Sequence, residues 1–270
     1  MPSGKPPVRG TDRWPAAVLA FLTLCLALAA AEVPAQPQAA RDAFYKGIIE
    51  GKSGVPQKAI DYFGEAIRID PKFVLAYYNR AITLQQVGDE QRAIRDYSEA
   101  IRLEPHFADA YVGRGAAREN LKQYDQAIKD YSDAIRLAPT VALIRANRAS
   151  AYDKSGRYPE AIGDYEEALR LDPRDDETLD SFAWLLATVA NPALRDGKRA
   201  TQLAREACEL TQWKEPNHLD TLAAAYARSG DFASAVKWQT KALEDPGFRK
   251  VREAQERLAL YRAGKPYPPK

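Results

Sequence analysis

The chain has 270 residues, and 46% of them are hydrophobic, which excludes a mostly disordered protein. Its formal net charge is +2, and residues 1–31 supply all of it, because Lys5, Arg9 and Arg13 outnumber the single Asp12. The remainder is formally neutral, which argues against a nucleic-acid-binding protein, since such a protein needs a net basic face.

Residues 1–31 have the pattern of a secretory signal peptide: basic residues precede an uncharged apolar run, Ala16–Ala31, whose last three alanines offer a cleavage site. An uncleaved membrane anchor is the alternative, in which residues 14–31 tether the chain, although a membrane-spanning helix needs about 20 apolar residues. In both cases the rest of the chain is exported, to the periplasm or to the periplasmic face of the inner membrane. Residues 32–40, which contain two prolines, are interpreted as a linker.

A period of 34 residues organises the next part of the chain, 41–175. Alanines and prolines recur at this spacing: Ala59, Ala93, Ala127 and Ala161; Ala66, Ala100, Ala134 and Ala168; Pro71, Pro105, Pro139 and Pro173. The period predicts four repeats of two amphipathic helices each, at about 40–73, 74–107, 108–141 and 142–175. The alanines let the paired helices approach closely while larger apolar side chains fill the space beside them. Glycine lies in the turn between the helices, except in the third repeat, which has Lys122 there.

This period, with its fixed small and large positions, resembles the tetratricopeptide repeat (TPR). The resemblance implies an all-α fold, a TPR solenoid in which helix–turn–helix repeats form a right-handed superhelix, closed by a C-terminal capping helix. It also implies that the chain binds a protein or peptide partner, because binding is what such repeats do.

The 34-residue phase breaks after Pro173, and about five residues are inserted before the next equivalent alanine, Ala200. Residues 176–246 are predicted to form two divergent TPR-like repeats, which resemble the closing repeat pair of many bacterial TPR proteins. Their helices are expected at Ser181–Val189, Lys198–Leu210, Pro216–Arg228 and Phe232–Leu243. A last helix, Phe248–Ala263 within residues 247–264, is predicted to cap the exposed core of the last repeat, and residues 265–270 form a tail.

Arginines and aspartates recur in step with the repeats. Each arginine lies on a first helix, 16 residues before an aspartate on the second helix: Arg80 and Asp96, Arg114 and Asp130, Arg148 and Asp164. We predict that they form internal ion pairs that fix the register of the helices, because the guanidinium fork suits a partly buried carboxylate. The alternative is a ladder of arginines that binds acidic peptides.

In TPR proteins the first helix of each repeat lines a concave groove that commonly binds peptides, and the resemblance implies the same surface here. Asn79 and Asn147 fall where the family often has an asparagine that hydrogen-bonds a peptide backbone. The other residues expected on this surface are Tyr78, Gln85, Gln86, Asp109, Glu119, Asn120, Asp153 and Lys154. The TPR domains that clamp a terminal carboxylate combine the asparagine with lysines and arginines, and Asp109 stands where that group has lysine. The alternative role of Asn79 is to cap or orient its own helix.

The inventory of chemically reactive residues is poor, so we predict no enzyme activity, no cofactor and no metal. The two histidines, His106 and His218, fall in or near loops and outside any Cys/His cluster. Cys208 has no base partner nearby in sequence and is expected to be a buried apolar residue. The acidic run at 175–177 is interpreted as a solvated loop between repeats. The tryptophans Trp184, Trp213 and Trp238 are interpreted as packing residues rather than a ligand cage.

Together these observations favour a non-enzymatic interaction scaffold in the bacterial cell envelope that binds a peptide or partner protein in the groove. The alternative is a small-ligand-binding or enzymatic role centred on the divergent segment 175–213. A third alternative is self-association through the exposed apolar faces of terminal repeats.

Overall fold

The computed structural model describes residues 36–268, so the segment predicted to be a signal or anchor lies outside them. Within the described residues all regular structure is helical and no β-strand occurs, which confirms the predicted all-α fold. The chain divides into two compact units, one ending at Leu121 and the other beginning at Lys122. No helix within residues 36–268 is long and apolar enough to cross a membrane.

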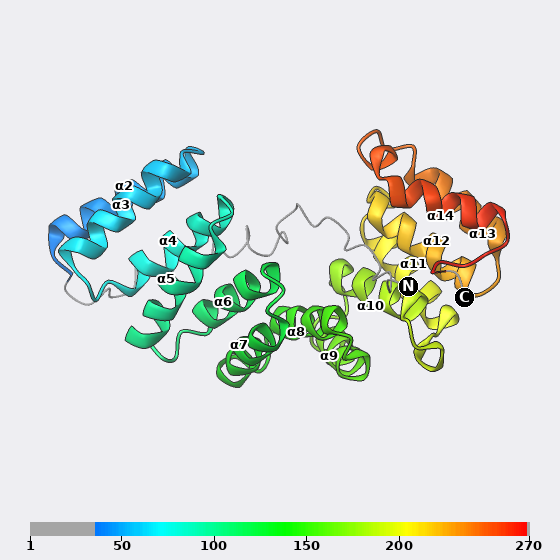
Figure 1. Ribbon diagram of the computed structural model, residues 1–270, viewed down its shortest axis with the longest axis horizontal. Helices are drawn as coiled ribbons and strands as arrows, with labels where there is room; N and C mark the ends of the chain where they lie inside the picture. The colour runs from blue at the N-terminus through cyan, green and yellow to red at the C-terminus, as the bar shows by residue number, and fades with distance from the viewer. Residues whose placement is uncertain (1–35, 269–270) are drawn as a thin grey trace, which may run out of the picture. The chain divides into compact units, whose positions relative to one another are not determined.

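The first unit consists of consecutive helices that pack side by side, each against the next (Figure 1). The helices are α2 (Gln38–Lys52), α3 (Pro56–Ile69), α4 (Val74–Gln86), α5 (Glu90–Leu103) and α6 (Ala108–Asn120). Residues 38–40 were predicted to belong to a linker, but they are the start of α2, which begins at Gln38, directly after Pro37. Proline has no amide hydrogen to donate, so it is well tolerated at the start of a helix.

Small residues allow the close helix packing of the first unit, as the sequence pattern requires. The recurring alanines Ala59, Ala66, Ala93 and Ala100 are 0% exposed. Phe63 packs beside Gly47, where a Cβ atom would lie 2.6 Å from the phenylalanine ring. In the same way Tyr97 fills the space beside Gly113, where a Cβ atom would lie 2.5 Å from Cζ of the tyrosine. These glycines are therefore required by the large aromatic side chains of the neighbouring second helices.

The turn between the paired helices uses a left-handed residue. Gly54, Gly88 and Gly156 have φ of 74°, 80° and 83°, and Lys122 occupies the same place in the third repeat with φ of 60°. Lysine carries a Cβ atom that disfavours this conformation by about 1–2 kcal/mol. The third repeat thus keeps the turn geometry of the others at a cost in backbone strain.

The second unit continues the packing of consecutive helices and ends in the divergent part (Figure 1). Its α-helices are α7 (Tyr124–Leu137), α8 (Ala142–Ser155), α9 (Tyr158–Leu171), α10 (Asp176–Thr188), α11 (Gly197–Leu210), α12 (Pro216–Arg228), α13 (Phe232–Ala242) and α14 (Arg252–Arg262). Two short 3₁₀ helices, η1 (Pro192–Leu194) and η2 (Phe248–Lys250), precede α11 and α14.

The start of α10 differs from the sequence prediction. The apolar pattern placed this helix at Ser181, and the structure begins it at Asp176. The polar residues Asp176 and Glu177, interpreted from sequence as a solvated loop, form its acidic first turn. Negative charge is favourable at a helix N-terminus because the free backbone N–H groups and the helix dipole make that end positive.

The last helix covers the end of the second unit through a buried polar network, as expected of a capping helix. Arg257 of α14 donates to both carboxylate oxygens of Asp220 on α12, at 2.8 Å each. Gln239 of α13 donates to Oδ1 of the same aspartate at 2.7 Å. The side chains of Arg257 and Asp220 are 5% and 0% exposed. One buried carboxylate therefore ties the cap to both helices of the sixth repeat.

The three tryptophans of the divergent part make packing contacts, as interpreted from sequence. Trp213 and Trp238 stack with ring centroids 4.7 Å apart. Trp184 packs on Tyr267, with 5.9 Å between ring centroids, and the Arg257 guanidinium lies over its ring. Trp213 reaches its partner from a left-handed backbone conformation, with φ of 62°.

Candidate functional site

Two of the predicted arginine–aspartate pairs lie within one unit each, and in both the arginine grips the carboxylate with two hydrogen bonds. Arg80 donates to Asp96 at 2.7 and 2.8 Å, and Arg148 donates to Asp164 at 2.6 and 2.7 Å. Both arginines are largely buried, with side chains 22% and 19% exposed. Hydrogen bonding to the aspartate is the largest cause that raises the pKa of each arginine.

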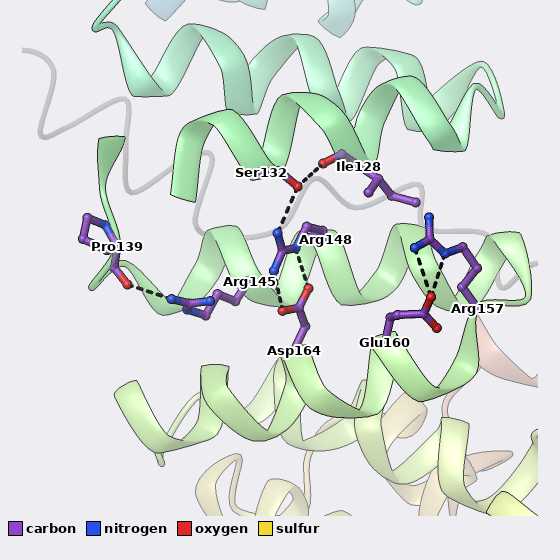
Figure 2. Close-up of polar contacts among 8 residues, drawn as sticks. All are labelled: Ile128, Ser132, Pro139, Arg145, Arg148, Arg157, Glu160 and Asp164. Carbon is purple, nitrogen blue, oxygen red and sulfur yellow. Dashed lines mark hydrogen bonds and ion pairs between the residues drawn. The ribbon is translucent and has the colours of Figure 1, made fainter. Parts of the chain in front are cut away.

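Arg148 also reaches back to the preceding repeat. Its Nη1 donates to the hydroxyl of Ser132 on α7 at 2.9 Å, so the side chain links α7, α8 and α9 (Figure 2). Arg114 makes the equivalent bond to Ser98 at 3.0 Å. Arg114 belongs to the first unit and Asp130 to the second, so their pairing stays a prediction. Arg80 and Arg148 act as internal clamps between helices, which favours the register role over a ladder of arginines that binds acidic peptides.

Several residues expected on the peptide-binding surface are instead used inside the repeats. Tyr78 and Gln85 are buried, with 7% and 5% exposed, which corrects their placement on an open surface. The amide of Gln85 accepts from the Tyr97 hydroxyl at 2.7 Å and donates to Glu90 at 3.2 Å. Gln85, on the first helix, therefore faces the interior, because the buried hydroxyl of Tyr97 on the second helix needs a hydrogen-bond partner.

The two asparagines on the first helices of the first unit also have internal partners. Asn79 donates to the carbonyl oxygen of Leu75 in its own helix at 2.8 Å, which is the alternative role considered from sequence. Asn120 donates to Glu90 at 2.7 Å, joining the end of α6 to the start of α5. Glu90 thus receives bonds from both Gln85 and Asn120, while burial is the largest effect on its pKa and raises it.

The remaining candidates stay accessible on the first helices. Gln86 and Lys154 are exposed, and Glu119, Asn147 and Asp153 are half-buried. Asp153, in the last turn of α8, is the most perturbed of these, since burial raises its pKa to about 6 while nearby Lys154 acts in the opposite direction. Burial likewise raises the pKa of Asp109, in the first turn of α6. Within residues 36–268, neither carboxylate forms a hydrogen bond or an ion pair, so burial removes water from each without a hydrogen bond in its place.

A third group was not foreseen from sequence. Asp176 and Glu177 in the first turn of α10 lie next to His218 in the first turn of α12, with their potential ligand atoms within 4.8 Å of one another. His218 is 3% exposed, and its Nε2 lies 3.7 Å from Oδ2 of Asp176. His218 is 42 residues from Asp176 in the chain, so no short sequence motif contains all three residues. Only the packing of α10 against α12 brings its members together.

The one cysteine among the described residues is not a reactive thiol. Cys208 is fully buried in α11, as expected from sequence. Burial raises its pKa to about 12, with smaller contributions from Asp180 and Glu209. Since the thiolate is the nucleophile, this residue has no reactive form at neutral pH.

A comparison with known protein families identifies the repeats. The tetratricopeptide repeat model matches residues 74–107, 108–141 and 142–175, so three consecutive TPR units are present in a chain with a TPR fold. No curated protein sequence matches the chain.

Solved structures show the same fold. The chain is similar to PilW, a widely conserved type IV pilus biogenesis factor, with a TM-score of 0.70 and 15% identity over 82% of this chain and 98% of PilW. It is also similar to MamA from Desulfovibrio magneticus RS-1, with a TM-score of 0.60 and 23% identity over 67% of this chain and 99% of that one. At these identities the similarity concerns the fold alone.

Proposed function

We propose that the chain is a non-enzymatic scaffold that binds a protein partner on the face formed by the first helices of its repeats. TPR proteins generally bind protein partners, and the TPR fold supports such a role. The observation that carries the proposal is the state of Asp153, a half-buried carboxylate on a first helix with a raised pKa and no hydrogen bond or ion pair within residues 36–268.

The chemistry of this face favours a basic segment of the partner. The two arginines with established pairs, Arg80 and Arg148, are consumed by internal aspartates and are not available to hold an acidic ligand. Two half-buried charges on the first helices form no hydrogen bond or ion pair within residues 36–268, Asp109 and Asp153, and both are negative. A lysine or arginine of the partner would restore the interactions that these carboxylates lost on burial, and a charge-assisted hydrogen bond is stronger than a neutral one.

We further propose that the scaffold works in the cell envelope. The support is the pattern of a signal or anchor in residues 1–31, which would deliver the repeats across the membrane, with residues 14–31 as the tether if they are retained. The similarity in fold to PilW, itself a pilus biogenesis factor, is compatible with such a place.

The test compares two variants that remove the same charge from the same repeat. Asp153→Asn lies on the first helix α8, and Glu167→Gln lies on the second helix α9, where Glu167 pairs with Arg170. A lysine-rich peptide and a glutamate-rich peptide of equal length are titrated against the full chain by fluorescence anisotropy. We expect binding of the lysine-rich peptide alone, weakened about fivefold by Asp153→Asn, which corresponds to about 1 kcal/mol.

Glu167→Gln is expected to bind the lysine-rich peptide as the wild type does. Equal losses in both variants would show that net charge alone attracts the peptide, and tighter binding of the glutamate-rich peptide would overturn the assignment of a basic partner.

A further inference from the structure

A buried histidine and two carboxylates meet where the first turns of α10 and α12 pack together. They belong to one unit and come from two different helices, so the fold itself holds them in place. Asp176 is partly exposed and Glu177 is exposed, while His218 is 97% removed from solvent. The group thus opens to water on its carboxylate side and is anchored on its imidazole side.

The surroundings of His218 are compatible with the tautomer that has its proton on Nδ1. The hydroxyl of Thr211 lies 3.0 Å from the carbonyl oxygen of Ala207 and 3.2 Å from that of Cys208, and it donates to these acceptors in its own helix turn. Its oxygen is then free to accept from Nδ1–H of His218, 3.4 Å away. This tautomer leaves a lone pair on Nε2.

The lone pair on Nε2 is directed toward negative charge. Nε2 lies 3.7 Å from Oδ2 of Asp176, which is longer than a hydrogen bond. One nitrogen and two carboxylates thus lie with their potential ligand atoms within 4.8 Å of one another, and a cation bound between them would interact favourably with all three. Histidines that bind metals usually donate their other N–H to a fixed acceptor, and the hydroxyl oxygen of Thr211, 3.4 Å from Nδ1, offers His218 such an acceptor.

We propose that Asp176, Glu177 and His218 form a binding site for a divalent transition-metal ion, with Zn²⁺ as the best match. Imidazole nitrogen and carboxylate oxygen are both zinc ligands, whereas Mg²⁺ and Ca²⁺ prefer oxygen ligands alone. Ligand atoms around tetrahedral zinc are about 3.4 Å apart, as follows from metal–ligand distances of about 2.1 Å. The three ligand atoms already lie within 4.8 Å, and the exposed Glu177 side chain is free to close the difference.

The site would join the first turns of α10 and α12 across the divergent part of the chain. Three protein ligands leave the remaining coordination positions to water. The bound ion would fix the contact between the fifth and sixth repeats, and it would raise the stability of the folded chain because the unfolded chain does not hold the three ligands together. This inference does not rest on the proposed basic partner.

The test is a titration of the full chain, without an affinity tag and freed of metal by a chelator, with Zn²⁺ in a calorimeter. Mg²⁺ and Ca²⁺ are titrated in parallel, and the thermal midpoint is measured with and without Zn²⁺. The variants are His218→Gln and Glu177→Gln, and the matched control is His106→Gln, which removes the other histidine from an exposed loop.

We expect one Zn²⁺ per chain, a higher thermal midpoint with Zn²⁺, no comparable binding of Mg²⁺ or Ca²⁺, and wild-type binding by His106→Gln. Glu177→Gln changes an exposed side chain, so it tests the site even if His218→Gln fails to fold, and each folded variant is expected to lose affinity at least tenfold. The proposal is overturned if Zn²⁺ does not bind, if Glu177→Gln binds it as tightly as the wild type, or if Mg²⁺ and Ca²⁺ bind equally well.

Discussion

The buried pair of Arg257 and Asp220 connects the capping helix α14 to α12. We predict that Arg257→Met destabilises the chain by about 3–5 kcal/mol, because it leaves the Asp220 carboxylate buried without its cation. Asp220 is 0% exposed, and the neutral amide of Gln239, which also donates to it, cannot replace the lost cation. Burial alone would lower the pKa of Arg257, but attraction and hydrogen bonds from Asp220 outweigh it and raise the pKa.

The assay is urea unfolding followed by tryptophan fluorescence, since the Arg257 guanidinium lies 5.4 Å from the ring centroid of Trp184. The control is Arg252→Met in the same helix, whose ion pair with Glu256 is 86% and 56% exposed. Such an exposed pair contributes at most about 0.5 kcal/mol.

A double variant separates the charge from the packing of the arginine stem. Asp220→Leu combined with Arg257→Met removes both charges, and we expect it to recover most of the stability lost by Arg257→Met alone, because replacing a whole buried pair by apolar residues is often neutral. The reasoning is refuted if Arg257→Met costs no more than Arg252→Met, or if the double variant is as unstable as the sum of the two single changes.

Three further predictions concern the repeats. Gly113→Ala should destabilise the chain by about 1–3 kcal/mol, because the new Cβ atom would clash with the Tyr97 ring. Gly163→Ala should stabilise it by about 0.5–1 kcal/mol, because no atom lies within 4 Å of the new Cβ. Urea unfolding measures both changes, and effects of the same sign would contradict the packing. Lys122→Gly should stabilise the folded chain by about 0.5 kcal/mol in the same assay, because relief of the left-handed strain exceeds the added entropy of the unfolded chain. A loss of stability would show that the lysine side chain makes a favourable contact of its own. Folding raises the pKa of Asp153 from 3.8 to about 6, so its ionisation should lower the stability of the folded chain progressively as the pH rises from about 4 through 6. The stability of Asp153→Asn should therefore increase relative to that of the wild type over this range. A difference in stability that does not change with pH would exclude the shift.

The periodic part of the fold followed from local pattern. The alanines at 34-residue spacing and the turn glycines mark helix pairs through contacts between neighbours in sequence. In the divergent part, α12 was predicted with the bounds that it has, Pro216–Arg228. The start of α10 was missed because an apolar pattern does not report a polar first turn such as Asp176-Glu177. A helix begins there for electrostatic reasons that the periodicity of apolar residues does not contain.

The site was less predictable, because it depends on partners from other helices. The repeat pattern predicted Gln85 on an open surface, but its side chain is buried and accepts a hydrogen bond from the hydroxyl of Tyr97 on the next helix. His218 was interpreted as a residue near a loop, and only the contact of α12 with α10 shows that it faces two carboxylates. Sequence periodicity predicts the position of a residue on its own helix. The burial and the partners of Gln85 and His218 depend on the side chains of a neighbouring helix, which the periodicity does not give.

The most direct test of the central claim is a comparison of two photocrosslinking positions in one repeat, in cells that make the full chain. A photoreactive amino acid replaces either Lys154, exposed on the first helix α8, or Arg170, whose side chain is 66% exposed on the second helix α9. The proposed function predicts a protein crosslink from position 154 that Asp153→Asn weakens, and none from position 170. A crosslink from position 170 alone, or from neither position, would contradict binding on the face of the first helices.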